Sequence, residues 1–271
     1  MNEYDKVPSS VEDRLNYIAS CQLPEGDSRV AEVINPTHRR SRRSLAVDEK
    51  AEGAAVVANS IVSFVAGMSK QSKEDIKNAV LFATLVANKA HPNMSGPLWY
   101  EQFVNVMIRA CGWVPTRREY SKYTASEHMF TMDQVGLKIL ASAVAAVTVP
   151  GATAAVLVGV AQQALEALQA SDKPLKLFEG KSRRHNGGAF SIASCVESAD
   201  GEVAMAMGSV DFSSVLSAKN VLFWDWNSNS VSISRAESCL VLNQNIYAEV
   251  RDSILRKLGT NAKQAIEEYE I

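Results

Sequence analysis

Cysteine chemistry is the clearest reactivity that this sequence offers. The chain of 271 residues holds four cysteines, Cys21, Cys111, Cys195 and Cys239, and no two of them form a CxxC pair. Such wide spacing in a chain of this length is typical of reduced thiols in a cytosolic protein rather than of a disulfide framework. A reduced thiol can act as a nucleophile or carry an acyl chain as a thioester, and we consider both hypotheses for Cys195.

The residues around Cys195 predict a β-hairpin with an unusual distribution of side-chain sizes. Asp200-Gly201 is a strong turn signal, and a two-residue loop there places Cys195 opposite Ala206. Because protein interiors contain few voids, something must approach a face of small side chains closely. Two occupants fit, a helix from the alanine-rich part of the chain or an acyl chain attached to Cys195. The predicted small-residue face consists of Ser191, Ala193, Cys195, Ala204, Ala206 and Gly208.

Sequence signatures of the common enzyme classes are absent. The chain has no GxSxG, HExxH, GxxxxGK[ST] or GxGxxG motif. Its four histidines, His38, His91, His128 and His185, are isolated from one another and lack metal-ligand spacing. We therefore expect no metal, no cofactor and no enzyme, although a triad dispersed along the chain is compatible with the sequence.

The segment 139–161 is the most apolar part of the chain and holds no charged residue over 23 positions. Its length would suit a membrane span, but it is built largely from Ala, Gly, Thr and Val. Pro150-Gly151 interrupts it at the middle, and proline disfavours a helix interior by about 3 kcal/mol. We expect two buried helices that meet at a Pro-Gly corner. A segment that inserts into a bilayer, as in α-helical pore-forming toxins, is the alternative.

Basic residues gather in two short clusters that are candidates for contact with phospholipid head groups. Solvated loops are the simpler interpretation of each cluster. The net charge of −2 and the pI near 6.1 argue against a dedicated nucleic-acid-binding protein. The two clusters together favour a lipid or membrane surface as the partner. The first cluster holds Arg39, Arg40, Arg42 and Arg43, and the second holds Lys181, Arg183 and Arg184.

The organisation of the chain predicts a single α+β domain over residues 1–271, with helices to about residue 171 and an antiparallel sheet plus a final helix over 172–271. Helical spacing is expected from Leu45 through the apolar positions Val57, Ile61, Phe64, Val65 and Met68, and again from Ser72 and Pro97. Thr131 to Gln134 has the form of a capping box that opens the apolar segment. The polar stretch 113–126 is expected to be a loop.

The second half of the chain predicts short strands and a last helix. The final helix is expected over 246–269, packed with the alanine-rich pair and the sheet in one α+β architecture. The predicted strands are 175–178, 190–196, 203–210, 221–226, 231–235 and 239–243.

The N-terminal sequence MNEYDKVPSSVEDRLNYIAS is polar and acidic, and it lacks the basic start and apolar run of a secretory signal. We therefore expect a protein made in the cytoplasm without a signal peptide. Action outside the cell would require membrane association or release by a route other than the Sec pathway.

The whole-chain layout resembles the Erwinia virulence factor (Evf) family. The resemblance lies in the chain length, in the apolar pair ILASAVAAVTVPGATAAVLVGVA, in a sheet in the second half and in a cysteine within AFSIASCVES. It covers most of the chain without a diagnostic short motif. The resemblance implies a factor without known enzymatic activity that promotes bacterial persistence in an insect host. It also implies a palmitate-like chain held by a thioester on Cys195, with Cys239 as the second choice.

Three hypotheses about function follow. The first is an acylated, membrane-associating virulence factor, the second an α-helical pore-forming toxin that inserts residues 139–161, and the third an acyl-handling enzyme with Cys195 as its nucleophile. The sequence names no host target.

Overall fold

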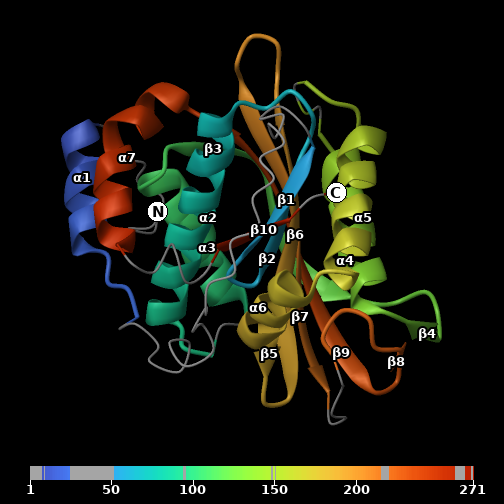
Figure 1. Ribbon diagram of the computed structural model, residues 1–271. Helices are drawn as coiled ribbons and strands as arrows, with labels where there is room; N and C mark the ends of the chain where they lie inside the picture. Colours follow the sequence, from blue (N-terminus) through green and yellow to red (C-terminus); the bar gives the residue numbers. More distant parts are fainter. Residues whose placement is uncertain are drawn as a thin grey trace, which may run out of the picture.

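A mostly antiparallel mixed sheet forms the middle of the molecule in this computed structural model (Figure 1). The structure describes residues 8, 10–24, 52–93, 96–147, 149, 151–214, 220–259, 266–269 and 271. The α+β class expected from the sequence is confirmed. The strand order is β10-β1-β2-β6-β7-β9-β3, and β5 pairs with β6 beside this path. The strands of this sheet are β1 (Gly53–Val57), β2 (Ser60–Phe64), β3 (Trp113–Tyr123), β5 (Arg183–Arg184), β6 (Gly187–Glu197), β7 (Val203–Ser214), β9 (Val231–Leu242) and β10 (Ile266–Tyr269).

Helices cover both faces of the sheet and bury two separate apolar cores against it. One face carries α1 (Val11–Ser20), α2 (Lys70–Ala90), α3 (Gly96–Arg109) and α7 (Gln244–Leu258), which we call the α2 layer. The other face carries α4 (Met132–Ala145), α5 (Ala154–Gln169) and α6 (Asp172–Ser182), which we call the α4–α5 layer. The two layers lie on opposite sides of the strands in Figure 1. A small second sheet joins β4 (Met129–Phe130) to β8 (Trp226–Asn227).

The prediction of a helix from Leu45 through Met68 is wrong where the structure describes it. Residues 53–64 form β1 and β2, joined by Ala58 and Asn59 in a two-residue turn with φ of 53° at Ala58. All five residues of β2 are buried, because helices lie over both faces of the sheet. A strand buried on both faces has a continuous apolar run instead of alternation, so its spacing can be mistaken for that of a helix.

The expected loop at 113–126 is also wrong, because residues 113–123 form β3 at one edge of the sheet. Charged side chains such as Arg117, Arg118 and Glu119 lie along this strand. An edge strand is half solvated, and charges on it discourage pairing with other chains. Its polarity therefore hid a strand that pairs with β9 along nearly its whole length.

The expected strand at 175–178 is wrong, because these residues lie inside helix α6. Asp172 and Pro174 lie in the first turn of this helix, where an acidic residue and a proline are both favourable. The last predicted helix ends at Leu258, and the residues from Ile266 return to the sheet as β10. The predicted strands 231–235 and 239–243 are one strand, β9, while residues 221–225 lie outside any strand. The sheet thus takes β1, β2 and β3 from the first half of the chain.

The apolar segment 139–161 forms the two helices that the sequence predicts. Helix α4 begins after Thr131, whose backbone N–H donates to the Gln134 side chain at 3.3 Å as the capping box requires. Helix α5 begins after Thr153, whose hydroxyl accepts from the Val156 N–H at 3.4 Å. Pro150 lies outside the described residues, and Gly151 adopts a φ of 87° between the two helices.

Candidate functional site

The β6–β7 hairpin around Cys195 has a register that differs by one residue from the predicted one. Ser198 and Glu202 close a three-residue loop, and Gly201 supplies the φ of 81° that such a loop needs. As a result Cys195 lies opposite Met205 rather than Ala206. A shift by one residue moves a strand's side chains to the other face, so the predicted small-residue face does not exist as one surface.

Cys195 lies on the face of the sheet beneath the α2 layer. Its neighbours across the strands are Phe64 and Met205, and Ala193 lies on the same face. The side chain is fully buried, and burial raises the pKa of the Cys195 thiol well above its ordinary value. A thiol in this environment stays protonated at neutral pH, the reverse of the lowered pKa that activates a cysteine nucleophile.

The small residues Ala204, Ala206 and Gly208 lie on the opposite face, beneath helix α4. A Cβ placed on Gly208 would lie 2.6 Å from the backbone nitrogen of Leu140. On the helix side, a Cβ on Gly136 would lie 2.5 Å from Cδ1 of Ile192. The helix and the sheet therefore approach each other at two glycines. Of the two occupants considered for the small residues, the structure places the alanine-rich helix there.

Cys239 is the cysteine that shares a face with these small residues. It pairs with Ala206 in the β7–β9 register, and its Sγ–H donates to the carbonyl oxygen of Ala143 at 3.4 Å. Burial raises the pKa of its thiol to about 11, against the lowering effect of the nearby Arg117 guanidinium. The second choice for acyl attachment thus lies between the sheet and α4. Of the other predicted lining residues, Ala193 shares the face of Cys195, and the Ser191 and Ser209 hydroxyls are 2.8 Å apart.

The turn between α4 and α5 presents an uncharged surface to solvent. We define the corner surface as the exposed and half-buried residues that the structure describes in this turn. Val156 is the large apolar side chain of this surface that is exposed, and it is 44% accessible. The sequence holds no charge between Lys138 and Glu166. Gly151 abuts Ser198, so the corner surface lies beside the tip of the β6–β7 hairpin. The corner surface comprises Ala145, Ala146, Val147, Val149, Gly151, Ala152, Thr153, Ala154, Ala155 and Val156.

In the described part of the chain, none of the helices has the length and apolar character needed to cross a bilayer.

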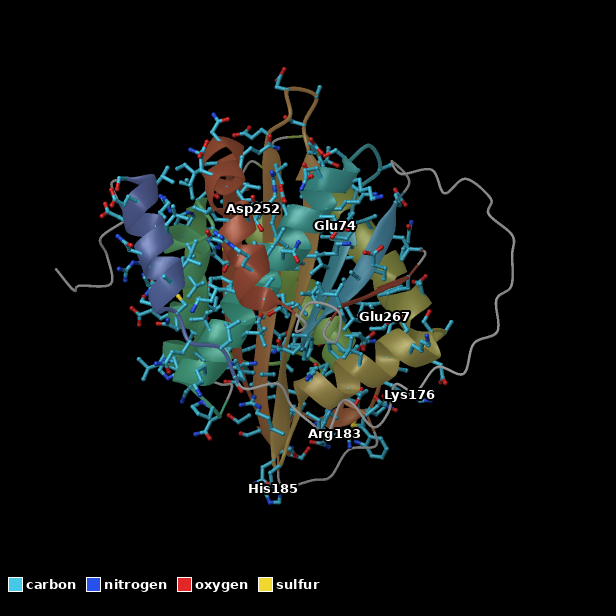
Figure 2. All side chains as sticks on the ribbon, turned by 60° about the vertical axis from the view of Figure 1, so that its left-hand side comes forward. Glu74, Lys176, Arg183, His185, Asp252 and Glu267 are labelled. Atoms are coloured by element: carbon cyan, nitrogen blue, oxygen red, sulfur yellow. The ribbon has the colours of Figure 1, made fainter. Side chains whose placement is uncertain are left out.

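The second basic cluster lies at the other end of the sheet. Arg183 pairs with Glu179 at 3.0 Å, and Arg184 pairs with Asp211, so part of the cluster's charge is neutralised within the protein. Figure 2 shows Arg183 and His185 at the end opposite the hairpin tip, and the eleven residues of β6 separate the two ends by roughly 33 Å. A flat membrane that contacts the end of the molecule with the corner surface therefore cannot also contact this cluster at the opposite end. The first cluster, at 39–43, lies outside the described residues.

A groove of about 380 Å³ between the ends of β3 and β9 was not predicted. No sequence pattern indicated this groove, because β3 was expected to be a loop and β9 to be two strands. Within the described ranges, no three His, Cys, Asp or Glu side chains gather as metal ligands would, and His128 contacts Asn227 and Ser228 instead. The groove is lined by Lys122, Tyr123, Thr124, Phe130, Asn229 and Ile233, among others.

Solved structures that resemble this fold include two distant likenesses. No family model matches this sequence, and no characterised protein matches it. The fold is similar to that of a delta-endotoxin, with 11% identity and a TM-score of 0.41, over 77% of this chain and 90% of that one. It is also similar to the Evf virulence factor, with 9% identity and a TM-score of 0.32, over 74% of this chain and 82% of that one.

Proposed function

We propose that this chain is a toxin-like virulence protein that associates with lipid membranes through the corner surface. The observation that carries the proposal is the exposure of this uncharged surface at one end of the molecule, with Val156 at 44% accessibility. Exposed apolar surface that is free of charge is typical of sites that meet a partner or a bilayer. The insect host implied by the resemblance to the Evf family stays a prediction.

The α4–α5 layer is suited to this role because of how it is held. Residues such as Ile139, Leu140, Leu157 and Leu165 bury apolar side chains against the sheet. Contacts of this kind have no directional partner, and lipid tails can replace them on the helix side. The layer can therefore exchange contact with the sheet for contact with a bilayer.

The corner surface alone would bind weakly, because burying one exposed large side chain contributes about 1.5–3 kcal/mol. A covalent acyl chain would add about 0.8 kcal/mol per buried methylene, and stable anchoring takes two such signals. We therefore keep the palmitate-like thioester as part of the proposal. Its position is better supported at Cys239 than at Cys195, because the sulfur of Cys239 points to Ala143 in the same helix that leads into the corner surface.

An acyl chain on Cys239 would require α4 to move away from the sheet, because the two elements touch closely at Gly208 and Gly136. Attachment at Cys195 would instead place the chain under α2, on the face remote from the corner surface. We propose no catalytic role for either thiol, since burial holds both pKa values above the ordinary range.

Vesicle flotation of the purified protein tests the proposal. Val156→Glu places a charge on the corner surface at its large exposed apolar side chain, and we expect it to reduce the bound fraction at least fivefold. The matched control is Leu255→Glu, because Leu255 is 41% accessible on α7 in the other layer. Equal binding by the two variants would contradict the role of the corner surface.

Release of a dye from the same vesicles distinguishes association from pore formation. Binding without leakage supports membrane association, and rapid leakage by the wild-type chain supports the pore-forming alternative. Intact mass before and after neutral hydroxylamine, on wild type, Cys239→Ala and Cys195→Ala, shows whether a thioester is present and which cysteine carries it.

A further inference from the structure

The groove between the ends of β3 and β9 is lined by three separate segments of the chain. Residues 122–125 continue from the end of β3, Phe130 lies in β4, and residues 228–233 run from the turn after β8 into β9. The pairing of Tyr123 with Ile233 joins the two long strands here, and the pairing of β4 with β8 places the small sheet beside them. The groove volume of about 380 Å³ falls within the roughly 300–1,000 Å³ that is usual for small-molecule sites.

The wall that the turn after β8 contributes is held in place by hydrogen bonds. The Asn229 N–H donates to the side-chain oxygen of Asn227 at 2.9 Å, and the Ser230 N–H donates to the carbonyl oxygen of Asn227 at 2.9 Å. The Ser228 N–H donates to the carbonyl oxygen of His128 at 3.0 Å, which ties the turn to the segment before β4. A wall that is already ordered lowers the entropic cost of binding a ligand.

The floor of the groove is apolar. Phe130 and Ile233 are 4% and 5% accessible, and Tyr123 and Val231 are half-buried. All four side chains pack into the core between the sheet and the α4–α5 layer. A tyrosine combines an apolar ring with a hydroxyl at its tip, so this floor suits a ligand that has both C–H groups and hydroxyl groups.

The rim of the groove supplies hydrogen-bonding groups and a positive charge. Its hydroxyl and amide side chains can both donate and accept, as the hydroxyl groups of a sugar also do. Lys122 is exposed and is the one charged residue among the lining residues that the structure describes. Within the described ranges no carboxylate pairs with it, whereas Arg117 on the same strand pairs with Glu119 and Glu237. The Lys122 ammonium is therefore available to an anionic group. The polar residues of the rim are Lys122, Thr124, Ser228, Asn229 and Ser232.

We propose that this groove binds a saccharide that carries a carboxylate, such as a uronic acid. The apolar C–H groups of the sugar ring lie on the floor beside Tyr123, the rim side chains bind the sugar hydroxyls, and the Lys122 ammonium pairs with the carboxylate. A peptide that added a strand to β3 would instead meet the charges along that edge. Saccharide binding at this site does not depend on the membrane contact proposed above.

The groove lies at the end of the sheet that is remote from the corner surface. Strand β9 begins at the groove and ends beside the tip of the β6–β7 hairpin, because Val231 pairs with Ser214 and Leu242 pairs with Val203. The twelve residues of β9 separate the two ends by roughly 40 Å, and Figure 1 shows β4 and β8 at the end opposite the hairpin tip. A molecule attached through the corner surface would hold the groove away from that bilayer. The groove therefore suits a soluble or extended glycan rather than a short glycolipid in the same membrane.

Titration of the isotope-labelled full chain with small sugars, followed by NMR chemical shifts, tests the proposal. The probes are methyl glucuronide, methyl glucoside and sodium acetate. The two sugars differ only in the carboxylate, and acetate supplies a carboxylate without the ring. We expect methyl glucuronide to bind with a Kd on the order of 1–10 mM, about fivefold more tightly than the glucoside and about tenfold more tightly than acetate. The shifts should be largest in residues 122–125 and 228–233.

Two variants separate the charge from the shape of the groove. Lys122→Gln should raise the Kd for methyl glucuronide about fivefold, to that of methyl glucoside, and leave the Kd for the glucoside unchanged. Ser232→Trp fills the groove and should abolish binding of both sugars. The matched control is Lys176→Gln, because Lys176 is an exposed lysine on α6, which contacts β1 and β10 at the other edge of the sheet (Figure 2). Unchanged Tm values show that each variant is folded.

Several results would overturn the proposal. These are equal Kd values for the two sugars with the wild-type chain, acetate binding as tight as that of the glucuronide, shifts centred away from the groove, and no binding of the glucuronide at about 50 mM. A preference for the glucuronide that persists in Lys122→Gln would also overturn it. Flotation of Lys122→Gln with glycan-free vesicles should match wild type, so a failure of the membrane proposal is distinguishable from a failure of this one.

Discussion

The two helical layers are held to the same sheet by different kinds of interaction. In the α2 layer, the carboxylate of buried Asp75 accepts two hydrogen bonds from Arg251, at 2.8 and 2.7 Å. The buried Lys77 ammonium pairs with Glu74 and with Glu268 of β10. The Tyr100 hydroxyl donates to the carbonyl oxygen of Glu237 at 2.9 Å. Charged and polar groups thus link this layer to the sheet and to the C-terminal segment.

The α4–α5 layer meets the sheet almost entirely through apolar side chains in the part of the chain that the structure describes. Between α4 and the sheet, the Cys239 thiol donates to the Ala143 carbonyl, and sulfur is a weak donor. The ion pair of Arg183 in β5 with Glu179 in α6 lies at the far end of the layer. A polar layer that leaves the sheet loses specific partners, each costly to leave unpaired. An apolar layer loses contacts that lipid can restore. The difference suggests that one layer maintains the fold and the other is able to move.

The substitution Gly208→Ala is expected to have the largest effect among the tests of this comparison. A Cβ at this position would lie 2.6 Å from the Leu140 nitrogen, so α4 must shift from the sheet. We expect unfolding free energy to fall by about 3 kcal/mol and vesicle binding to rise. Urea denaturation and flotation measure the two effects. The control is Gly159→Ala, where a Cβ meets nothing within 4 Å and a gain of about 0.5–1 kcal/mol is expected. A neutral Gly208→Ala would show that close approach does not hold this layer.

Asp75→Asn tests the other layer. The substitution leaves the Arg251 guanidinium without its carboxylate, and we expect the unfolding free energy to fall by about 2 kcal/mol. Because the change lies in the layer that we expect to stay in place, vesicle binding should remain within twofold of wild type. Asp252→Asn on α7 is the matched control, since this carboxylate is exposed, as Figure 2 shows. A large change in vesicle binding by Asp75→Asn alone would contradict the division between the layers.

Alkylation rates of Cys239 and Cys195 compare the two layers directly, with a smaller expected effect than the substitutions above. A pKa of about 11 for Cys239 leaves little thiolate at pH 8, so its alkylation should be on the order of 100-fold slower than that of an ordinary thiol. The rate should rise about tenfold per pH unit until the pH nears 11. Neutral vesicles should increase labelling of Cys239 about tenfold if the α4–α5 layer lifts, while Cys195 under α2 stays unlabelled. Equal exposure of both cysteines would indicate general unfolding.

The sequence predicted those elements whose local signals agree with their surroundings. The capping box at Thr131, the break between α4 and α5 and the hairpin near Gly201 all follow from nearby residues. It failed for β2 and β3, because burial on both faces and position at an edge are properties of the assembled sheet. The charged residues of β3 are consistent with an edge position, but they indicate an edge only once the segment is known to be a strand.

The candidate site depended on a single residue of register. The Asp200-Gly201 signal correctly gave a hairpin, but the loop holds three residues instead of two. That one position moved Ala204, Ala206 and Gly208 away from Cys195 and toward Cys239. A turn signal predicts that two strands form a hairpin. It does not determine the register between them when loops of two and of three residues are both compatible with the same glycine.

The order of strands also determines when the chain can finish folding. The β1–β10 pair joins residues near 55 to residues near 268, and β2 pairs with β6 about 130 positions later. Contacts so distant in sequence form slowly, because long loops must close before any pairing is gained. During synthesis, the apolar β1–β2 hairpin therefore emerges from the ribosome long before β6 and β10, which pair with its two outer edges. These edges stay unpaired until the later strands are made, so a chaperone that holds the nascent chain should increase the yield of folded protein.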